Sequence, residues 1–370
     1  MYYLIIVLVF ITVLYSLIIL TFTFGWIKIK PFKFNQRSSK IPVSIVIPFR
    51  NEAENVLNII HDIKNQTYAK DDFELILVND HSTDNSVELI LTQDLDEIMV
   101  KLLNLDINEG KKAALQLGIE NSNYELIITT DADCRIGKNW LEIFVDFYLK
   151  CNPNIIVGPV LYSESKRCLS HFQNLEFLSL IASTAGAIGI SKPIMANGAN
   201  LAFNKKVYSE INLRSKIASG DDIFLIHSTK KLNRKSIMFL KSKEALVRTA
   251  SPKNIHQFIQ QRIRWASKSI YYNDFDALFT ALTVFLFNLM IIALLITGIK
   301  NPFSLTLALI AYLIKLTVDF PVLFMTSKYF NRLNMMKFYP VIQLIYPFYI
   351  AGTVILSLFT NKTWKGRIIK

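Results

Sequence analysis

Long apolar stretches at both ends of the chain contrast with short apolar runs in its middle. A helix that crosses the hydrocarbon core of a bilayer needs about 20 mostly apolar residues in a row. Four stretches meet this requirement, namely residues 1–26, 277–299, 302–327 and 338–360. The pattern therefore predicts one membrane anchor ahead of the central part of the chain and about three membrane segments after it.

The first stretch has the features of an anchor that is not cleaved. It is longer than the core of a signal peptide, has no basic start and shows no A-x-A cleavage site. The first cations, Lys28, Lys30 and Lys33, follow it directly. Because cationic loops stay on the cytoplasmic side of a membrane, we expect the N-terminus outside and the central part in the cytoplasm.

The last two stretches contain features that a simple crossing helix lacks. Lys315 and Asp319 are four residues apart, so on a helix they share a face and can pair. Such a pair either ties helices together or marks a function, as intramembrane charges often do. Pro340, Pro347 and Gly352 interrupt the last stretch, and basic residues flank it on both sides. That stretch is either a crossing or a re-entrant or interfacial segment, which leaves the number of crossings open by one.

From about residue 41 to residue 250, short apolar runs alternate with amphipathic ones. The predicted strands cover 43–47, 73–78, 126–128 and 155–157, and the predicted helices cover 52–65, 84–94, 111–121 and 138–150. This alternation is typical of a mostly parallel sheet covered by helices on both faces, so the predicted fold class is α/β. In such sheets ligands bind beyond the carboxyl ends of the strands.

Charge and cysteine content narrow the function classes. The formal net charge is +12, and basic residues gather beside the membrane stretches. This fits the bias of cationic loops toward the cytoplasm and an attraction to anionic lipids, and no nucleic-acid-binding motif accompanies it. The three cysteines include no C-x-x-C pair, so neither a disulfide framework nor a zinc site is indicated. Reduced thiols in a cytosolic domain fit best.

Acidic residues stand where the predicted strands and one helix end or begin. Asp80 follows a strand, where a carboxylate can accept hydrogen bonds from a base or a ribose, or alternatively cap a helix. Asp131 and Asp133 follow another strand, and two acids with one residue between them can offer oxygens to Mg²⁺ or Mn²⁺. Asp221 and Asp222 open a helical run, where the helix dipole alone also favours acids.

Residues 251–276 form an amphipathic helical pattern just ahead of the second membrane stretch, suited to the headgroup layer. Within it, Arg264 can neutralise a diphosphate with its planar guanidinium, and Trp265 can stack on a ligand or lie at the interface. Lipid anchoring alone is the alternative. Neither G-x-G-x-x-G nor G-x-x-x-x-G-K-[ST] occurs, so a nucleotide would have to be bound by another device.

Taken in chain order, these clusters resemble the family-two glycosyltransferases from about Val43 to Trp265 and on into the membrane tail. The matching segments are the P-x-x-N-E turn from Pro48 to Glu52, Asp80, the Gly110–Lys111 step, the D-x-D of Asp131 and Asp133, the segment Asn197–Asn200, the acid pair Asp221–Asp222, and Q-x-x-R-W at Gln261, Arg264 and Trp265. The family's acid pair begins with glutamate, whereas this chain has the shorter Asp221. The tail Trp364–Arg367 resembles the C-terminus of lipid-glycosylating members.

The resemblance implies an inverting, metal-dependent sugar transfer from a nucleotide-sugar donor, with UDP as the default nucleotide, on an α/β domain of the GT-A type. It implies that Asp222 is the catalytic base. It further implies donor contacts by Pro48, Glu52, Asp80, Lys111, Asp131, Gln261, Arg264 and Trp265, acceptor-side contacts by Asn197, Gly198, Asn200 and Asp221, and a divalent cation, Mg²⁺ or Mn²⁺, on Asp133 with Asp131 in support.

The expected protein is thus an integral enzyme of a bacterial cell membrane, with its catalytic domain in the cytoplasm and a lipid or other amphiphile as acceptor. Residues 169–190 are apolar enough to line an acceptor groove or to form a core helix. A processive polysaccharide synthase would share the motifs but usually has more membrane helices. Two further alternatives are a nucleotide-sugar-binding membrane protein without activity, and a transporter, suggested by Lys315 and Asp319 alone.

Overall fold

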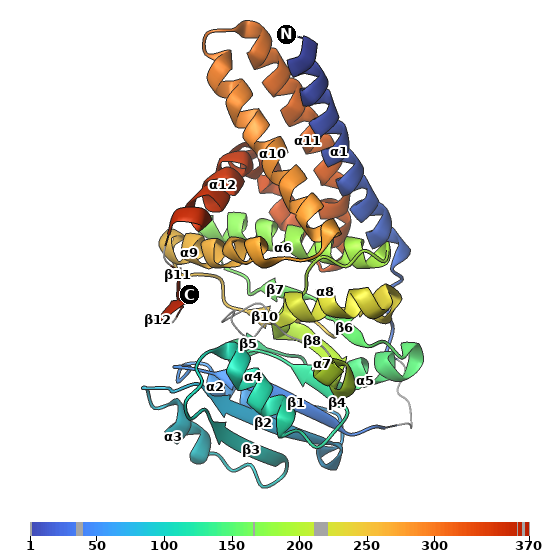
Figure 1. Cartoon of the computed structure of the whole chain (residues 1–370). Coiled ribbons are helices and arrows are strands. Elements are labelled where there is room, and N and C mark those ends of the chain that lie inside the picture. The colour runs from blue at the N-terminus through green and yellow to red at the C-terminus, as the bar shows by residue number, and fades with distance from the viewer. Residues whose placement is uncertain are drawn as a thin grey trace.

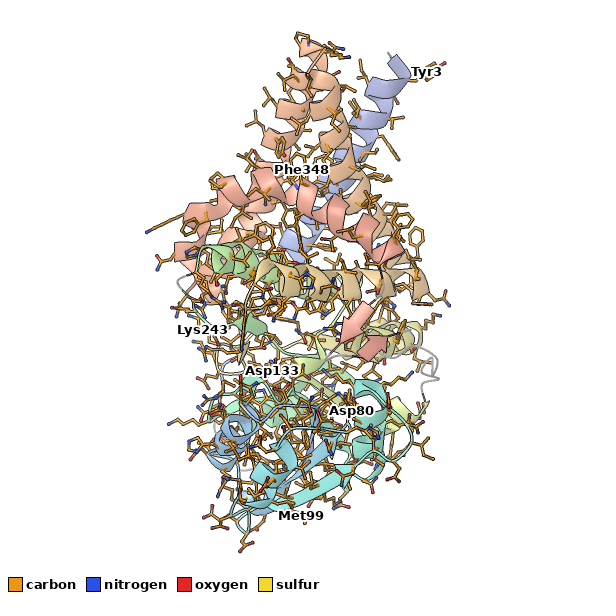
Figure 2. All side chains as sticks on the ribbon, turned by 90° about the vertical axis from the view of Figure 1, so that its left-hand side faces the viewer. Tyr3, Asp80, Met99, Asp133, Lys243 and Phe348 are labelled. Atoms are coloured by element: carbon orange, nitrogen blue, oxygen red, sulfur yellow. The ribbon has the colours of Figure 1, made fainter. Side chains whose placement is uncertain are left out.

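The structure, a computed structural model, describes residues 2–34, 40–165, 167–210, 221–360, 362–364 and 367–369. Figure 1 shows an α/β domain at one end of the molecule and a group of long helices at the other. Tyr3 and Met99 mark these two opposite ends in Figure 2. The predicted α/β class, with helices apolar enough to span a membrane at both ends of the chain, is confirmed.

The α/β domain is built on a seven-stranded sheet. Its strands lie in the order β3 (Met99–Asn104), β2 (Phe73–Asn79), β1 (Val43–Phe49), β4 (Leu126–Thr129), β8 (Leu201–Asn204), β6 (Ile155–Val157) and β9 (Ile237–Phe239). Neighbours are parallel, except that β8 runs antiparallel to β4 and β6. All residues of β1, β2 and β4 are buried, which explains their apolar sequences. The apolar pattern missed β3, whose residues are only half-buried or exposed.

Helices connect these strands and cover the sheet. The predicted helices correspond to α2 (Val56–Lys64), α3 (Ser86–Leu91), α4 (Lys111–Glu120) and α5 (Trp140–Cys151); α7 (Lys205–Glu210) and α8 (Asp221–Asn233) follow. A second sheet has the order β5 (Cys134–Arg135), β10 (Val247–Thr249) and β7 (Val160–Tyr162), and β11 (Lys362–Trp364) pairs with β12 (Arg367–Ile369). Short 3₁₀ helices include η2 (Gly198–Asn200), η4 (Ser267–Tyr271) and η5 (Leu333–Phe338).

In the part of the chain that the structure describes, four helices are long and apolar enough to cross a membrane. They are α1 (Tyr2–Lys28), α10 (Phe275–Gly298), α11 (Pro302–Tyr329) and α12 (Tyr339–Phe359). Between them and the α/β domain lie α6 (Cys168–Gly189) and α9 (Ile255–Ala266), roughly side by side in Figure 1. Large apolar side chains such as Phe10, Leu313 and Phe348 are exposed on the long helices, as a lipid environment would favour.

Glycines allow α1 to cross α6 at backbone contact. A Cβ atom at Gly25 would overlap the backbone of Gly186, and a Cβ atom at Gly186 would overlap the backbone of Phe22. Small residues permit such close approach of helices. At the end of α1, the Nζ of Lys241 donates hydrogen bonds to the carbonyl oxygens of Trp26 (2.8 Å) and Ile29 (3.0 Å). The anchor helix is thereby fixed to the α/β domain.

Both ends of α12 lie on the side of the α/β domain. Just ahead of the helix, the Nη2 of Arg332 lies 3.4 Å from the carbonyl oxygen of Tyr162, and the Nζ of Lys243 lies 3.0 Å from the Oδ1 of Asn331. After the helix, β11 contacts α9, and the chain ends beside it in Figure 1. Pro347 lies inside α12, and Figure 2 shows the neighbouring Phe348 near the crest of the helix.

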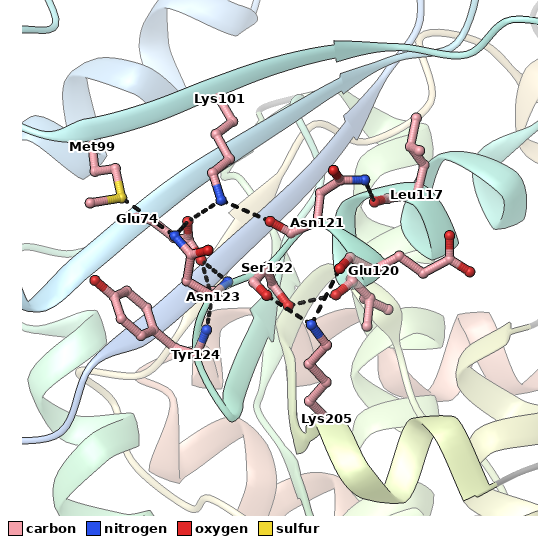
Figure 3. A network of polar contacts seen from close by, with 12 residues as sticks. Glu74, Met99, Lys101, Leu117, Glu120, Asn121, Ser122, Asn123, Tyr124 and Lys205 are labelled. Carbon is pink, nitrogen blue, oxygen red and sulfur yellow. Dashed lines mark hydrogen bonds and ion pairs between the residues drawn. The ribbon is translucent and has the colours of Figure 1, made fainter.

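A polar network holds the loop that leads from α4 into β4. Glu74 of β2 is fully buried and accepts hydrogen bonds from Ser44 Oγ (2.6 Å), Asn123 N (2.5 Å) and Asn123 Nδ2 (2.9 Å). The Nζ of Lys101 lies 2.9 Å from its carboxylate. Figure 3 shows this carboxylate at the centre of the contacts. Because β4 begins three residues after Asn123, the network sets the position of β4 in the sheet.

We expect Glu74→Leu to destabilise the protein by about 2–4 kcal/mol, because it leaves the backbone N–H of Asn123 without its acceptor and removes the carboxylate that pairs with Lys101. The unfolding temperature of the detergent-solubilised protein measures this. Glu88→Leu, on α3, is the control and should change the unfolding temperature little. Equal stability of Glu74→Leu and the unaltered protein would contradict the role of the network.

Candidate functional site

A cavity of about 830 Å³ lies between the α/β domain and the long helices. Its polar end is lined by side chains from the α/β domain and from α9: Pro48, Arg50, Glu52, Asp80, Lys111, Asp131, Asp133, Asn197, Gly198, Asp222, Gln261, Arg264 and Trp265. Figure 2 shows Asp80 and Asp133 at the edge of the α/β domain that faces the helices. The structure therefore brings together most of the side chains that the sequence singled out, although they are far apart along the chain.

Sheet geometry explains this convergence. The strands β1, β2 and β4 are parallel neighbours, so their carboxyl ends meet at one edge. Asp80 directly follows β2, and its backbone N–H continues the pairing with a hydrogen bond to Phe49 O of 2.9 Å. The guanidinium of Arg50 closes the turn by donating to the carbonyl oxygens of Asp80 and His81, each at 2.8 Å. Asp80 itself is 1% exposed.

Lys111 and the D-x-D acids share one electrostatic environment. The Nζ of Lys111 forms an ion pair with Asp131. Burial lowers the pKa of Lys111, but the charges of Asp131, Asp222 and Asp133 outweigh it and raise the pKa above its usual value. Arg264 faces the same acids: burial lowers its pKa, and Asp131 and Asp222 oppose that shift. Two cations and three carboxylates therefore surround one space.

The carboxylates of Asp131 and Asp133 fit a hard divalent cation, which prefers oxygen ligands. Thr249 Oγ1 lies 3.4 Å from Asp133 Oδ2. Burial and then the charges of Asp133 and Asp131 raise the pKa of the Cys134 thiol, so this neighbour stays a neutral thiol. Within the described residues, no cluster of three or more His, Cys, Asp or Glu side chains is arranged to hold a metal. A cation here would need additional ligands from a substrate or water.

Asp222 is oriented by two backbone N–H groups. Gly198 N donates to its Oδ2 at 3.0 Å and Ile223 N to its Oδ1 at 2.9 Å. Thr129 of β4 in turn donates from Oγ1 to Gly198 O at 2.8 Å, which ties this loop to the strand that leads to Asp131. Both carboxylate oxygens keep further lone pairs for a ligand. The side chain of Asp221 and the residue Gly220 lie outside what the structure describes.

The prediction that Asn200 contacts the acceptor is corrected by its position in the structure. It is fully buried and does not line the cavity. Its Oδ1 accepts from Trp140 Nε1 at 3.0 Å, and its Nδ2 donates to Pro159 O and Ala245 O at 2.8 Å each. With its hydrogen bonds directed into the protein, Asn200 joins three segments and holds Asn197 and Gly198, which do line the cavity, in place.

A buried ion pair fixes α9 to α6. Arg262 of α9 and Glu176 of α6 are 4% and 3% exposed, and two guanidinium nitrogens contact the two carboxylate oxygens. The guanidinium lies 4.3 Å from the ring of Trp265, and the Oη of Tyr349 on α12 donates to Glu176 Oε1 at 2.9 Å. Gln261 Oε1 accepts from Arg262 and from Tyr162 Oη. The pair therefore sets the positions of Gln261, Arg264 and Trp265.

Several of these residues were not predicted from the sequence. Arg262 lies inside the Q-x-x-R-W segment but is not one of its defining residues. Glu176 is a lone acid in an apolar run, and such an isolated charge could have indicated a buried partner. Tyr272 was missed as well. It lines the cavity, and burial followed by the charge of Asp222 raises its pKa. Nothing in the sequence around Tyr272 marks it as a neighbour of Asp222.

We expect Arg262→Met to cost about 3–5 kcal/mol of stability, because it leaves the Glu176 carboxylate buried without its counter-ion. Arg262→Met combined with Glu176→Gln should recover a large part of this loss, because no uncompensated charge remains and Tyr349 keeps an acceptor. Unfolding temperatures of the single and double variants in detergent provide the measurement. A double variant as unstable as the single one would show that the uncompensated charge of Glu176 is not the cause of the loss.

Comparison with known proteins supports the resemblance seen in the sequence. Residues 44–211 match the family described as Glycosyl transferase family 2. The chain is 27% identical over 198 residues to Glycosyltransferase AglE of Haloferax volcanii, a match that covers 52% of this chain and 62% of that relative. It is 26% identical over 232 residues to a Poly-beta-1,6-N-acetyl-D-glucosamine synthase of Staphylococcus epidermidis, which covers 60% of this chain and 53% of that relative. The chain thus matches less than two thirds of the length of either relative.

Among solved structures, the fold resembles that of the mannosyltransferase PcManGT from Pyrobaculum calidifontis in complex with GDP-Man and Mn²⁺. The TM-score is 0.58 at 16% sequence identity, and the likeness covers 95% of this chain and 98% of that chain. At this identity the likeness shows the fold, and it confirms the predicted GT-A type.

Proposed function

We propose, from the premise that residues 44–211 form a glycosyl transferase family 2 domain, that this protein transfers a sugar with inversion from a nucleotide-sugar donor to a lipid acceptor. The observation that carries the lipid acceptor is the extent of the cavity. The space that contains Asp133, Asp222 and Arg264 continues between the helices that are apolar enough to cross a membrane.

The polar end of the cavity has the groups that a nucleotide sugar requires. Pro48 lies at the carboxyl end of β1, and Glu52 and Asp80 follow β1 and β2, where nucleosides bind in α/β sheets. Lys111 and Arg264 offer positive charge to a diphosphate, with Gln261 and Trp265 beside them. We propose UDP as the nucleotide of the donor. The neighbour PcManGT was solved with GDP-Man, so GDP sugars belong in the same assay.

Asp222 is proposed as the general base. Its carboxylate removes the proton from the acceptor hydroxyl. The acceptor oxygen then bonds to the anomeric carbon from the face opposite the diphosphate, and the bond from that carbon to the diphosphate oxygen breaks with its electron pair. The two N–H groups that hold Asp222 fix the direction of its free lone pairs. Lys111 and Arg264 stabilise the charge that develops on the leaving nucleoside diphosphate.

A divalent cation, Mg²⁺ or Mn²⁺, fits the oxygens of Asp133 and Asp131, and PcManGT was solved with Mn²⁺. When bound, it would offset negative charge on the diphosphate. The ion pair with Lys111 holds the Asp131 side chain at the wall of the cavity. We propose that Asp133 is the stronger metal ligand and that Asp131 divides its charge between Lys111 and the cation.

The apolar end of the cavity supports a lipid rather than a sugar polymer as acceptor. It is lined by Leu175, Ile181 and Leu180 of α6, by Val284 and Phe285 of α10, and by Val322, Leu323, Ile342 and Ile350 of α11 and α12. Apolar walls favour a hydrocarbon chain over a hydrated polysaccharide. The segment 169–190 was predicted to line an acceptor groove or to form a core helix. Some of its residues line the cavity, and others pack in the hydrophobic core.

The arrangement of α12 supports a re-entrant or interfacial segment. Since the chain contacts the α/β domain before α12 and α9 after it, we propose that α12 enters the membrane and returns. With α1, α10 and α11 crossing, the basic loops and the α/β domain then share the cytoplasmic side. A bacterial cell membrane stays a prediction from the sequence.

A processive polysaccharide synthase is the second candidate, because one relative is named for such an activity. Chain length of the product distinguishes the two: a lipid carrying one sugar favours the proposal, and a long polymer favours the alternative.

We expect Asp222→Asn to lower the transfer rate by at least about a thousandfold, because the amide cannot take the acceptor's proton. The full-length protein is incubated with UDP-glucose, UDP-N-acetylglucosamine or GDP-mannose and a membrane lipid extract, and glycolipid is quantified by mass spectrometry. Donor affinity, measured by calorimetry, should change little. Asp71→Asn, an exposed acid away from the cavity, serves as the matched control. Persistent transfer by Asp222→Asn would exclude it as the base.

Chelation with EDTA should abolish transfer, and added Mg²⁺ or Mn²⁺ should restore it. We expect Asp133→Asn to raise the cation concentration needed for half-maximal activity by at least about tenfold, since it removes one of the two carboxylates. Titration of activity against each cation gives this value. Full activity in EDTA would refute the metal site while leaving the transferase proposal in place.

A further inference from the structure

A hydrogen-bonded cluster lies at the end of the cavity that is remote from Asp222. The predicted ion pair forms: Lys315 Nζ lies 2.5 Å from Asp319 Oδ2. Tyr15 of α1 donates from Oη to Asp319 Oδ1 at 2.7 Å and accepts from Lys315 Nζ at 3.1 Å. Lys315 is fully buried and Asp319 is 8% exposed. The opposite charges cancel, so this cluster adds no net charge within the membrane segments.

Gln343 of α12 also belongs to this cluster, and one of its two polar side-chain atoms has no hydrogen-bond partner among the described residues. Its Nε2 donates to Asp319 Oδ2 at 3.2 Å. The opposite orientation of the amide would place its oxygen against the carboxylate, so the hydrogen-bond pattern fixes Oε1 as the other atom. Gln343 is 4% exposed, and no donor among the described residues reaches its Oε1. A buried acceptor without a partner costs free energy, so this atom requires an explanation.

The position of Gln343 supplies that explanation, because Gln343, Asp319 and Tyr15 line the same cavity as Asp222 and Arg264. The apolar end of this cavity is therefore bordered by a side chain whose buried amide oxygen has no donor among the described residues. An anionic group would be repelled by that oxygen and by the nearby Asp319 carboxylate. Lys315 does not line the cavity and its charge is engaged by Asp319. A neutral hydrogen-bond donor is the chemistry that fits.

We propose that Gln343 binds a hydroxyl group carried on the hydrophobic chain of the acceptor, remote from the hydroxyl that receives the sugar. This inference rests on the proposed function, because it assigns the occupant of the cavity as the acceptor lipid. Recognition at two points would select acceptors by the distance between their two polar groups. A site built to hydrogen-bond a hydroxyl discriminates against the analogue that lacks it, because its own polar atom then stays unpaired.

The test compares three series of synthetic acceptors of increasing chain length: primary alkanols, α,ω-alkanediols and ω-methoxyalkanols. The ether keeps a polar oxygen at the far end but has no proton to donate. For the unaltered full-length protein we expect, at one chain length, the diol to have an apparent KM at least about fivefold below those of the alkanol and the ether. This exceeds the factor of about two that the diol's two equivalent ends supply.

In Gln343→Leu, the advantage of the diol over the ether should fall to the statistical factor. Thr353→Val is the matched control, because Thr353 lies on the same helix with a buried hydroxyl but does not line the cavity. It should keep the preference for the diol. Equal KM values for diol and ether in the unaltered protein, as expected if Gln343 holds a water molecule only, would overturn the inference.

Direct binding separates the two proposals. Radiolabelled diol is bound to the full-length protein in detergent without any donor, and the ether is used as competitor. Weak competition by the ether that becomes strong in Gln343→Leu supports the hydroxyl site even if no sugar is transferred. If alkanols, diols and ethers are all glycosylated equally well, the lipid acceptor stands and the hydroxyl site is refuted.

Discussion

The ion pair between Arg262 and Glu176 is the interaction on which the site depends. It joins α9, which carries Gln261, Arg264 and Trp265, to α6, which separates the α/β domain from the long helices. Burial of two charges is costly and is offset only when both are fully engaged. Here the guanidinium also faces the rings of Trp265 and Phe258, and Tyr349 donates to the carboxylate. One pair thus sets the orientation of α9, α6 and α12 around the cavity.

Two environments meet inside that cavity. At one end, carboxylates and cations gather where parallel strands end, and the carboxylates raise the pKa of Lys111 despite its burial. At the other end the walls are apolar. Water would weaken the electrostatic contacts at the first end and would not stabilise hydrocarbon at the second. The proposed sugar transfer to a lipid requires both environments in one continuous space.

Close backbone contact keeps the two halves in register. Gly25 and Gly186 let α1 touch α6, while Lys241 binds the carbonyl groups at the end of α1. Near the amino ends of β1 and β2, the Glu74 network positions β4, which leads to Asp131 and Asp133. Asn200 does the same for Asn197 and Gly198. Rigid supports of this kind hold reactive groups in place before a ligand binds.

The α/β class, the long apolar helices and the acids at the strand ends could all be predicted from the amino-acid pattern, because periodicity and buried β-strands are local properties that a chain displays residue by residue. The pattern also marked Lys315 and Asp319 as partners, since four residues bring two side chains to one face of a helix. Which polar groups face the cavity became apparent from the packing of the folded chain. Asn200 belongs to a motif yet turns inward, whereas Arg262, Glu176, Tyr272 and Gln343 surround the site without forming a pattern. Their roles arise from contacts between elements that are distant in sequence, and no local spacing encodes such contacts.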